Sequence, residues 1–383
     1  MLSLWERSEL LRADVVVVGG GVVGLWTALE CCRRYPQRST LVLERSTIPC
    51  GASTRNAGFA TIGTVGEATA HAELVGDTVV AGLMVERWLG LQRWRREFGD
   101  ATLGFEAVGG YELVFEGEEH LRDAVERWNE LLREAFGGTV FHDRPELLAQ
   151  WRWRPEGLRS IIANPYDGAL NTGKALRALQ QRALQAGATI WTGAKVELIE
   201  PDSEGIVVRL WDAGVQRQLE LRAKAIAVCA NAWIPQLVPE VADIQPARGQ
   251  VLLTVPVQDP PFPTGTYHFC QGYYYFRWVG QRLLFGGGRH LALQEETTYE
   301  PGLNPLLQQH LESLLETRLL GRRVDIENRW SGIMGMCPEK LPRVERVGER
   351  IVVGFGCNGM GLALAPRIAE QVAGLVGACL VDG

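Results

Sequence analysis

The chain has 383 residues, of which 46% are hydrophobic and 22% charged, and its formal net charge is −6. This length and composition predict a globular protein of about two domains, and they exclude a disordered chain, a collagen-like repeat and a coiled-coil rod. The acidic balance argues against a nucleic acid or an anionic membrane surface as the partner.

The first predicted elements form a βαβ unit. Residues 14–18 are a β-branched run, which is typical of a strand buried on both faces of a parallel sheet. A glycine-rich turn at 19–24 leads into an apolar helical stretch at 25–34, and a second strand at 40–43 ends in Glu44. This is the context that a dinucleotide-binding fingerprint requires.

The turn itself carries that fingerprint. Gly19, Gly21 and Gly24 have the spacing G-x-G-x-x-G. The first glycine allows a tight turn, the second lets the backbone approach a pyrophosphate, and the third lets helix and strand pack closely. Glu44 lies twenty residues beyond Gly24, where a carboxylate accepts hydrogen bonds from an adenosine ribose. The pattern predicts FAD or NAD and disfavours NADP.

The rest of the chain predicts further helices and strands around a proline-rich connector at 255–263. We expect helices at 78–98, 118–136, 174–186 and 362–379. We expect strands at 111–115, 139–141, 189–191, 206–210, 225–229, 273–278, 282–285 and 351–353. The segment 51–66 is rich in Gly, Ser, Thr and Asn and has no helical period.

Metal binding and membrane insertion are not predicted. The eight cysteines and six histidines have no metal-ligand spacing, and the histidines are expected at the surface or at helix caps. Charges at residues 6–12 argue against a signal peptide, and the apolar run 15–29 is too short to span a bilayer. These features predict a cytoplasmic protein without a transmembrane segment.

Two more glycine-containing motifs reveal a resemblance. They are Gly51-Ala-Ser-Thr-Arg-Asn-Ala-Gly-Phe59 and Gly354-Phe-Gly-Cys-Asn-Gly-Met-Gly361, and they are accompanied by Ala230-Asn-Ala-Trp233 and Trp330-Ser-Gly332. With these motifs the chain resembles the FAD-dependent D-amino-acid oxidase superfamily, which includes glycine oxidase, sarcosine oxidase, D-amino-acid dehydrogenases and γ-glutamylputrescine oxidoreductase.

The resemblance implies an α/β fold with two domains. A Rossmann-like FAD-binding domain of the glutathione-reductase type would comprise residues 1–78, 150–240 and 328–383. A mixed-sheet substrate domain would comprise residues 79–149 and 241–327 and form a lid over the flavin.

The resemblance also implies the residues that bind FAD. The FAD is expected to be non-covalent, because Cys337 does not match the position of the cysteine that holds FAD in enzymes resembling monomeric sarcosine oxidase. The implied cofactor-binding residues are Gly19, Gly21, Val22, Val23, Gly24, Glu44, Arg45, Ala52, Ser53, Arg55, Asn56, Ala57, Gly58, Val196, Ala230, Asn231, Trp233, Gly354, Asn358, Gly359, Met360 and Gly361.

The substrate site departs from the amino-acid-oxidising pattern. In relatives resembling glycine oxidase, an arginine two residues beyond the W-x-G motif binds the substrate carboxylate, but Met334 holds that position here. Arg277 would replace it if its side chain points into the site. Phe59, Tyr275 and Met334, with Tyr274, would line an apolar cage. Alternation along the strand puts Tyr273 and Tyr275 on one face and Tyr274 on the other, so one of these tyrosines lies outside the site.

The resemblance implies hydride transfer from the carbon next to nitrogen to flavin N5, which leaves an imine that hydrolyses. The sequence around Tyr274 and Arg282 is most similar to the γ-glutamylputrescine branch and favours an amine substrate. An amino-acid oxidase or dehydrogenase of the glycine or D-amino-acid type is the alternative, and an FAD-binding protein without turnover is another. Leu284 stands where the resembled oxidases place a lysine near the flavin, which argues against direct use of O2. The expected electron acceptor is therefore either O2 or another molecule, such as a quinone or a protein.

Overall fold

The computed structural model describes residues 2–151, 153–212, 214–356 and 358–381. The chain divides into two compact units: unit 1 is Met1–Thr54, Gly173–Pro246 and Met334–Gly383, and unit 2 is Arg55–Thr172 and Ala247–Ile333. The segments 55–78 and 150–172, which we expected in the FAD-binding domain, thus belong to unit 2. One reason is that β3 (Phe59–Ala60) pairs with β7 (Gly168–Ala169) and β6 (Leu158–Asn164) pairs with β4 (Gly110–Phe115).

Unit 1 is built on a mixed sheet with the strand order β17-β18-β11-β1-β2-β8. Its parallel strands are β1 (Arg12–Val18), β2 (Thr40–Glu44), β8 (Thr189–Thr192), β11 (Arg217–Val228) and β18 (Ile351–Phe355). The antiparallel additions are β17 (Arg343–Val347), β10 (Gly205–Asp212) and β9 (Ala194–Asp202). Val15, Val16 and Val17 at the centre are fully buried, as the β-branched run predicted.

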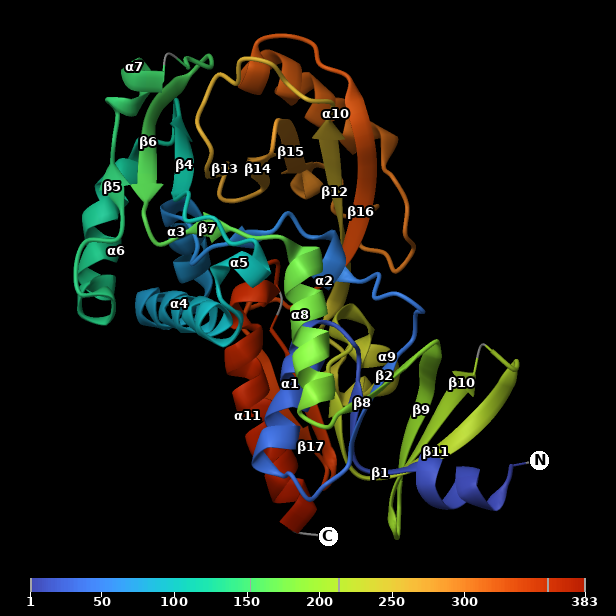
Figure 1. The fold of residues 1–383 in the computed structure, drawn as a ribbon. Helices are drawn as coiled ribbons and strands as arrows, with labels where there is room; N and C mark the ends of the chain where they lie inside the picture. The colour runs from blue at the N-terminus through green and yellow to red at the C-terminus, as the bar shows by residue number, and fades with distance from the viewer. Residues whose placement is uncertain (1, 152, 213, 357, 382–383) are drawn as a thin grey trace. The chain divides into compact units, whose positions relative to one another are not determined.

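Two helices pack against this sheet. Figure 1 shows α1 (Val22–Arg34) and α11 (Gly361–Val381) side by side. Among the described residues, α11 is the one helix long and apolar enough to cross a membrane, although half of its apolar window is buried inside the protein. Arg367 and Glu370 lie within this helix, so the sequence analysis did not recognise it as a long uncharged run. A buried core helix has the same composition, and Ile368 and Val372 on α11 are buried.

Unit 2 contains a second mixed sheet, with the order β16-β12-β15-β14-β13-β4-β6-β5. The strands not yet introduced are β5 (His142–Asp143), β12 (Gln245–Thr254), β13 (Thr266–Phe269), β14 (Tyr274–Val279), β15 (Arg282–Gly287) and β16 (Ile326–Met336). The helices α3 (Val65–Val75), α4 (Asp77–Phe98) and α6 (His120–Phe136) pack on one another, and α10 (Pro305–Leu314) packs against β15.

The remaining helices are short or peripheral. They are α2 (Ala52–Arg55), α5 (Asp100–Leu103), α7 (Leu147–Trp151), α8 (Thr172–Gln185) and α9 (Ile234–Leu237). The described residues also contain two short π-helices, η1 (Glu6–Leu10) and η5 (Leu315–Leu320), and three 3-10 helices, η2 (Asn231–Trp233), η3 (Pro239–Val241) and η4 (Arg289–Leu291).

One face of the unit 2 sheet carries an aromatic core. Side chains from four neighbouring strands stack there, for example Tyr267 on Phe276 at 4.8 Å between ring centroids and Phe269 on Tyr274 at 4.6 Å. The opposite face carries polar side chains and glycines, described below. Tyr274 therefore lies in the core and Tyr275 on the opposite face, as alternation along the strand predicted. The prediction is wrong for Tyr273, which precedes β14 and packs against the same core as Tyr274.

One predicted strand is wrong. Residues 139–141 are not a strand, and the short strand β5 begins at His142. The cause is Asn129 on α6, whose side-chain oxygen accepts hydrogen bonds from the backbone N–H groups of Val140 and Phe141. Its amide nitrogen donates to the Phe141 carbonyl. This side chain takes the backbone partners that a neighbouring strand would need.

Candidate functional site

The glycine fingerprint in unit 1 has the geometry that it predicts. Gly19 follows β1 with φ +110°, a conformation that L side chains rarely adopt. A Cβ atom on Gly24 would overlap the carbonyl oxygen of Gly19, so the first turn of α1 can approach the strand only because residue 24 lacks a side chain. The N-terminus of α1 is thereby placed directly beyond the end of β1, where backbone N–H groups can face a pyrophosphate.

Glu44 ends β2 and is only 9% exposed. Its Oε2 accepts a hydrogen bond from the Gly20 N–H (2.9 Å), and its Oε1 accepts one from the Ser46 N–H (3.0 Å). These bonds fix the carboxylate beside the glycine turn. Because each carboxylate oxygen can accept a second hydrogen bond, Glu44 retains acceptor capacity for ribose hydroxyls.

Ser53 connects the second motif to the first. Its hydroxyl accepts a hydrogen bond from the Val22 N–H (3.0 Å) at the start of α1. The Ser53 hydroxyl is thereby fixed at the N-terminus of α1. The bare glycine turn, the helix N-terminus and the buried carboxylate together fit the pyrophosphate and ribose of FAD.

Several other residues of unit 1 that the resemblance assigns to the cofactor make contacts within the protein. The side-chain oxygen of Asn231 accepts from the Gly335 N–H (3.1 Å). That of Asn358 accepts from the Cys337 N–H (2.9 Å), while the Asn358 amide donates to Leu341. These amides hold loops in place. Of the rest, Val196 is buried in the core, Arg45 stacks on Trp233 at 3.7 Å, Gly354 is buried on β18, and Gly359 has a positive φ.

In unit 2, two motifs that are far apart in the sequence meet. The Arg55 guanidinium donates to the Ser331 carbonyl (2.7 Å), and the Trp330 indole donates to the Arg55 carbonyl (3.0 Å). Asn56 accepts from the Gly58 N–H (2.9 Å), which closes the turn before Phe59. The W-x-G motif thus supports the loop that resembles the family's flavin-binding loop.

The polar side of the unit 2 sheet, called here the Arg277 face, is defined by strand register. Directly paired residues project from the same face. One row across β4, β13, β14, β15 and β12 contains Glu112, His268, Tyr275, Gly286 and Val251, and the next contains Gly110, Thr266, Arg277, Leu284 and Leu253.

Three aromatic rings form a chain on this face. The Phe59 ring meets His268 edge to face at 4.9 Å and Tyr275 at 5.9 Å. His268 is 7% exposed, and its Nδ1 has no hydrogen-bond partner among the described residues. Burial lowers the pKa of His268 to about 4, so the imidazole is neutral at pH 7. The expectation that the histidines lie at the surface or at caps is therefore wrong for His268.

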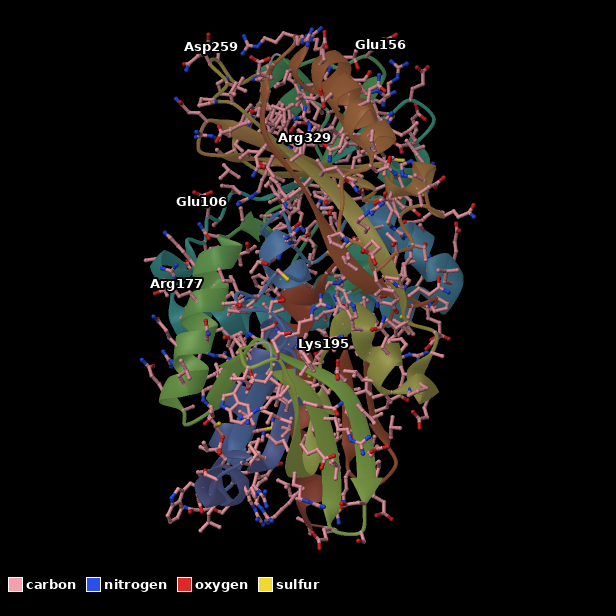
Figure 2. All side chains as sticks on the ribbon, turned by 90° about the vertical axis from the view of Figure 1, so that its right-hand side faces the viewer. Glu106, Glu156, Arg177, Lys195, Asp259 and Arg329 are labelled. Atoms are coloured by element: carbon pink, nitrogen blue, oxygen red, sulfur yellow. The ribbon has the colours of Figure 1, made fainter. Side chains whose placement is uncertain are left out.

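Arg277 is a buried cation with few partners. It is 8% exposed, its Nη2 donates to the Leu170 carbonyl (3.2 Å), and its Nε has no hydrogen-bond partner in the described part of the chain. Burial lowers the pKa of Arg277, and the negative charge of the exposed Glu106 (Figure 2) opposes this effect. The guanidinium lies beside Gly58, in the loop that carries Phe59. A buried guanidinium with open donors fits an anionic ligand.

Two buried carboxyl groups accept hydrogen bonds from the segment that follows Phe59. Asp167 accepts hydrogen bonds from the Thr61 hydroxyl (2.6 Å) and the Ile62 N–H (2.9 Å), and Glu112 accepts from the Gly66 N–H (3.0 Å). Burial raises the pKa of each carboxyl to about 7. Sequence reasoning did not single out these acids or His268, because each is an isolated residue whose partners come from a segment far away in the sequence.

Other predicted features lie elsewhere. Met334 is half-buried on β16 and belongs to unit 1, whereas Phe59, Tyr275 and Arg277 belong to unit 2. Tyr274 shares a hydrogen bond with His310 Nε2 (2.8 Å) on the aromatic side. Among the described residues, no group of His, Cys, Asp or Glu could hold a metal ion.

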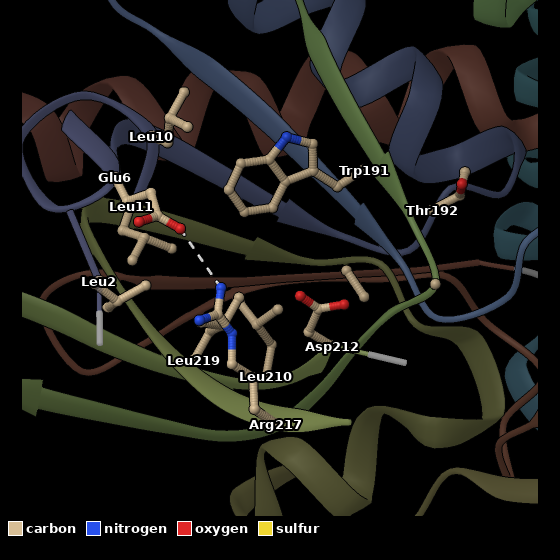
Figure 3. Close-up of a pocket in the computed structure, with 12 residues that line it drawn as sticks. Leu2, Glu6, Leu10, Leu11, Trp191, Thr192, Leu210, Asp212, Arg217 and Leu219 are labelled. Atoms are coloured by element: carbon tan, nitrogen blue, oxygen red, sulfur yellow. Dashed lines mark hydrogen bonds and ion pairs between the residues drawn. The ribbon is translucent and has the colours of Figure 1, made fainter. Parts of the chain in front are cut away.

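A separate cavity of about 280 Å³ lies in unit 1 (Figure 3). Trp191 and several leucines line it, and an ion pair between Arg217 and Glu6 crosses its side. It is lined by none of the glycine-motif residues and not by Val196.

Comparison with known proteins agrees with this geometry. The sequence profile of the family described as FAD dependent oxidoreductase (DAO) matches residues 14–375. The chain is 26% identical over 380 residues to glycine oxidase of Geobacillus kaustophilus (strain HTA426), covering 95% of this chain and 93% of that protein. It is 25% identical over 398 residues to γ-glutamylputrescine oxidoreductase of Escherichia coli (strain K12), covering 95% and 84%.

Solved structures show the same fold. The crystal structure of glycine oxidase from Geobacillus kaustophilus matches with a TM-score of 0.77 at 22% identity, covering 96% of this chain and 95% of that one. L-proline dehydrogenase from P. horikoshii matches with a TM-score of 0.74 at 20% identity, covering 95% and 93%.

These findings place the chain in the class of FAD-binding oxidoreductases. The predicted fold class, an α/β protein with an FAD-binding and a substrate domain, is confirmed. The chain belongs to the FAD dependent oxidoreductase (DAO) family. It is an FAD-dependent oxidoreductase that acts on the CH–NH group of amines or amino acids.

Proposed function

We propose that this enzyme oxidises an amino acid whose carboxylate is bound by Arg277. The observation that carries the proposal is the buried Arg277 guanidinium, which has an unpaired Nε and lies on the same sheet face as Tyr275 and beside the Phe59 loop. The sequence favoured an amine because the stretch around Tyr274 and Arg282 is most similar to the γ-glutamylputrescine branch, and Met334 holds the position of the expected carboxylate-binding arginine. Arg277 would restore the missing guanidinium from β14.

The residues of the Arg277 face have complementary roles in this reaction. Arg277 would hold the carboxylate through charge-assisted hydrogen bonds and fix the orientation of the substrate. The apolar surfaces of Phe59, Tyr275 and Leu284 would exclude water and favour the neutral amine, whose lone pair must be free. FAD, when bound, accepts the hydride that leaves the carbon next to nitrogen, and the imine left on the substrate then hydrolyses.

The cofactor would be held non-covalently by unit 1 through the glycine turn, Glu44 and Ser53. The electron acceptor, O2 or another molecule, and the cytoplasmic location stay predictions.

Exchange of Arg277 for methionine tests the proposal. In R277M the Michaelis constant for the best amino acid should rise about 100-fold, because two or more charge-assisted hydrogen bonds are lost. The same variant should oxidise a carboxylate-free amine no worse than the wild type. The matched control is R282M, which removes an exposed arginine of the neighbouring strand that pairs with Glu327.

A long-chain amine is the second candidate. The faces of Phe59 and Tyr275 can hold an ammonium group without any contribution from Arg277. A wild type with a higher kcat/KM for a long-chain amine than for every amino acid tested, together with unchanged amino-acid kinetics in R277M, would support this candidate over the amino acid.

A further inference from the structure

The Tyr275 ring lies directly over a glycine of the next strand. Tyr275 on β14 pairs with Gly286 on β15. A Cβ atom placed on Gly286 would lie 2.7 Å from three atoms at the outer end of the Tyr275 side chain: Cε2, Cζ and Oη. This is closer than van der Waals contact, so the ring occupies the space that any side chain at position 286 would need.

Phe59 borders the same ring on another side. The two rings meet edge to face at an interplanar angle of 78°, and His268 holds the second edge contact of Phe59. Burial raises the pKa of Tyr275 to about 12, so its hydroxyl remains protonated. Gly286 below and Phe59 beside the ring therefore determine its position.

Tyr275 is also the neighbour of Arg277 on this face. The two residues are two positions apart on β14 and project from the same side, roughly 7 Å apart along the strand. A substrate whose carboxylate is bound to Arg277 therefore has its remaining atoms within reach of the Tyr275 ring.

From these contacts we infer that Gly286 is a specificity-determining residue, which sets the size of the substrate side chain by letting the Tyr275 ring lie close against β15. The inference rests on the proposed function, because it assumes that the substrate is bound to Arg277. A methyl group at position 286 would push the ring away from β15 and reduce the room for the substrate.

Two substitutions should change the size preference in opposite directions. In G286A, kcat/KM for amino acids with large side chains should fall at least tenfold relative to glycine. In Y275A, the same ratio should rise. G286A should fold normally, because the methyl meets the far end of a flexible side chain and no backbone. Its melting temperature should stay within about 3 °C of the wild type.

The double variant tests whether Gly286 acts through Tyr275. With the ring removed, the methyl has nothing to displace, so G286A/Y275A should have the size preference of Y275A. The control is G82A. Gly82 lies in α4, and a Cβ atom placed on it would meet open space. A merely structural role of Gly286 would lower kcat/KM by the same factor for every substrate.

A binding assay provides a readout that needs no turnover. Acetate and phenylacetate would be titrated into the holoenzyme, and their dissociation constants measured from changes in the flavin spectrum. G286A should weaken phenylacetate binding about tenfold and leave acetate within threefold. Equal effects on both acids, or no effect, would overturn the inference. A wild type that binds neither acid, or R277M that binds both normally, would instead overturn the proposed function.

Discussion

The nucleotide turn of unit 1 and the Arg277 face of unit 2 are built in different ways. In the turn, Gly19 and Gly24 act through the backbone and Glu44 through its carboxylate, and one βαβ unit carries all three, so their spacing is fixed along the sequence. On the Arg277 face, each side chain comes from a different strand, and only register brings them together. A cofactor site made by local backbone leaves a motif in the sequence, whereas a substrate site made by a sheet face leaves none.

The largest effect is expected from the turn. In G24A the new methyl would overlap the Gly19 carbonyl, and neither partner can move because both are backbone. The purified variant should contain less than about a tenth of the wild-type FAD, measured as the ratio of flavin to protein absorbance. G82A should keep full FAD content. Normal FAD content in G24A would show that the close packing of α1 on β1 is dispensable.

A smaller effect is expected from Asp167, which has no motif. Its pKa is raised to about 7 in the folded protein, above the ordinary value of an aspartate, so the folded state binds the proton more tightly. Its contribution to stability is therefore greatest below pH 4 and is lost as the pH rises through 7. Asparagine keeps the shape without the charge, so the melting temperature of D167N should depend less on pH.

The measurement is thermal unfolding between pH 5 and pH 8. The difference in melting temperature between D167N and wild type should change by about 3–6 °C in favour of D167N as the pH rises. The control is E146Q, which removes an exposed carboxylate and should give a constant difference at these pH values. A constant difference for D167N as well would mean that Asp167 does not take up its proton near pH 7.

The smallest effect is expected from Arg45, which stacks on Trp233. An exposed cation–π pair contributes about 0.5–1 kcal/mol. R45Q should therefore weaken FAD binding by no more than about fivefold, measured by the fluorescence of released flavin. A hundredfold loss of affinity would show that Arg45 itself contacts FAD. Arg45 would then belong to the cofactor site together with the glycine turn.

The sequence predicted the fold class and the nucleotide turn because both depend on local patterns. The β-branched run, the glycines and Glu44 lie where the spacing placed them. The long strands β9, β12 and β16 were not predicted. In β9 (Ala194–Asp202) and β16 (Ile326–Met336), polar and apolar residues are mixed and only part of each strand is buried. Residues 139–141 were predicted wrongly because a side chain of α6 takes their backbone partners.

The candidate substrate residues were only partly predictable. Phe59, Tyr275 and Arg277 were named, and the opposite faces of Tyr274 and Tyr275 were right, but Tyr273 lies before the strand and the sequence could not show which way Arg277 points. His268 and Asp167 carry no local signal, since their burial depends on strands and loops more than 100 residues away. Gly286 resembles any strand glycine until the register places Tyr275 over it.

The most direct test of the central claim is the anaerobic reduction of the purified flavoprotein. Its visible spectrum would be recorded after adding amino acids and, separately, amines with the same side chain but no carboxylate. We expect rapid bleaching of the flavin bands by at least one amino acid and slow or no bleaching by its amine counterpart. Equal or faster bleaching by the amines would contradict the role of Arg277, and a flavin that no donor bleaches would indicate an FAD-binding protein without turnover.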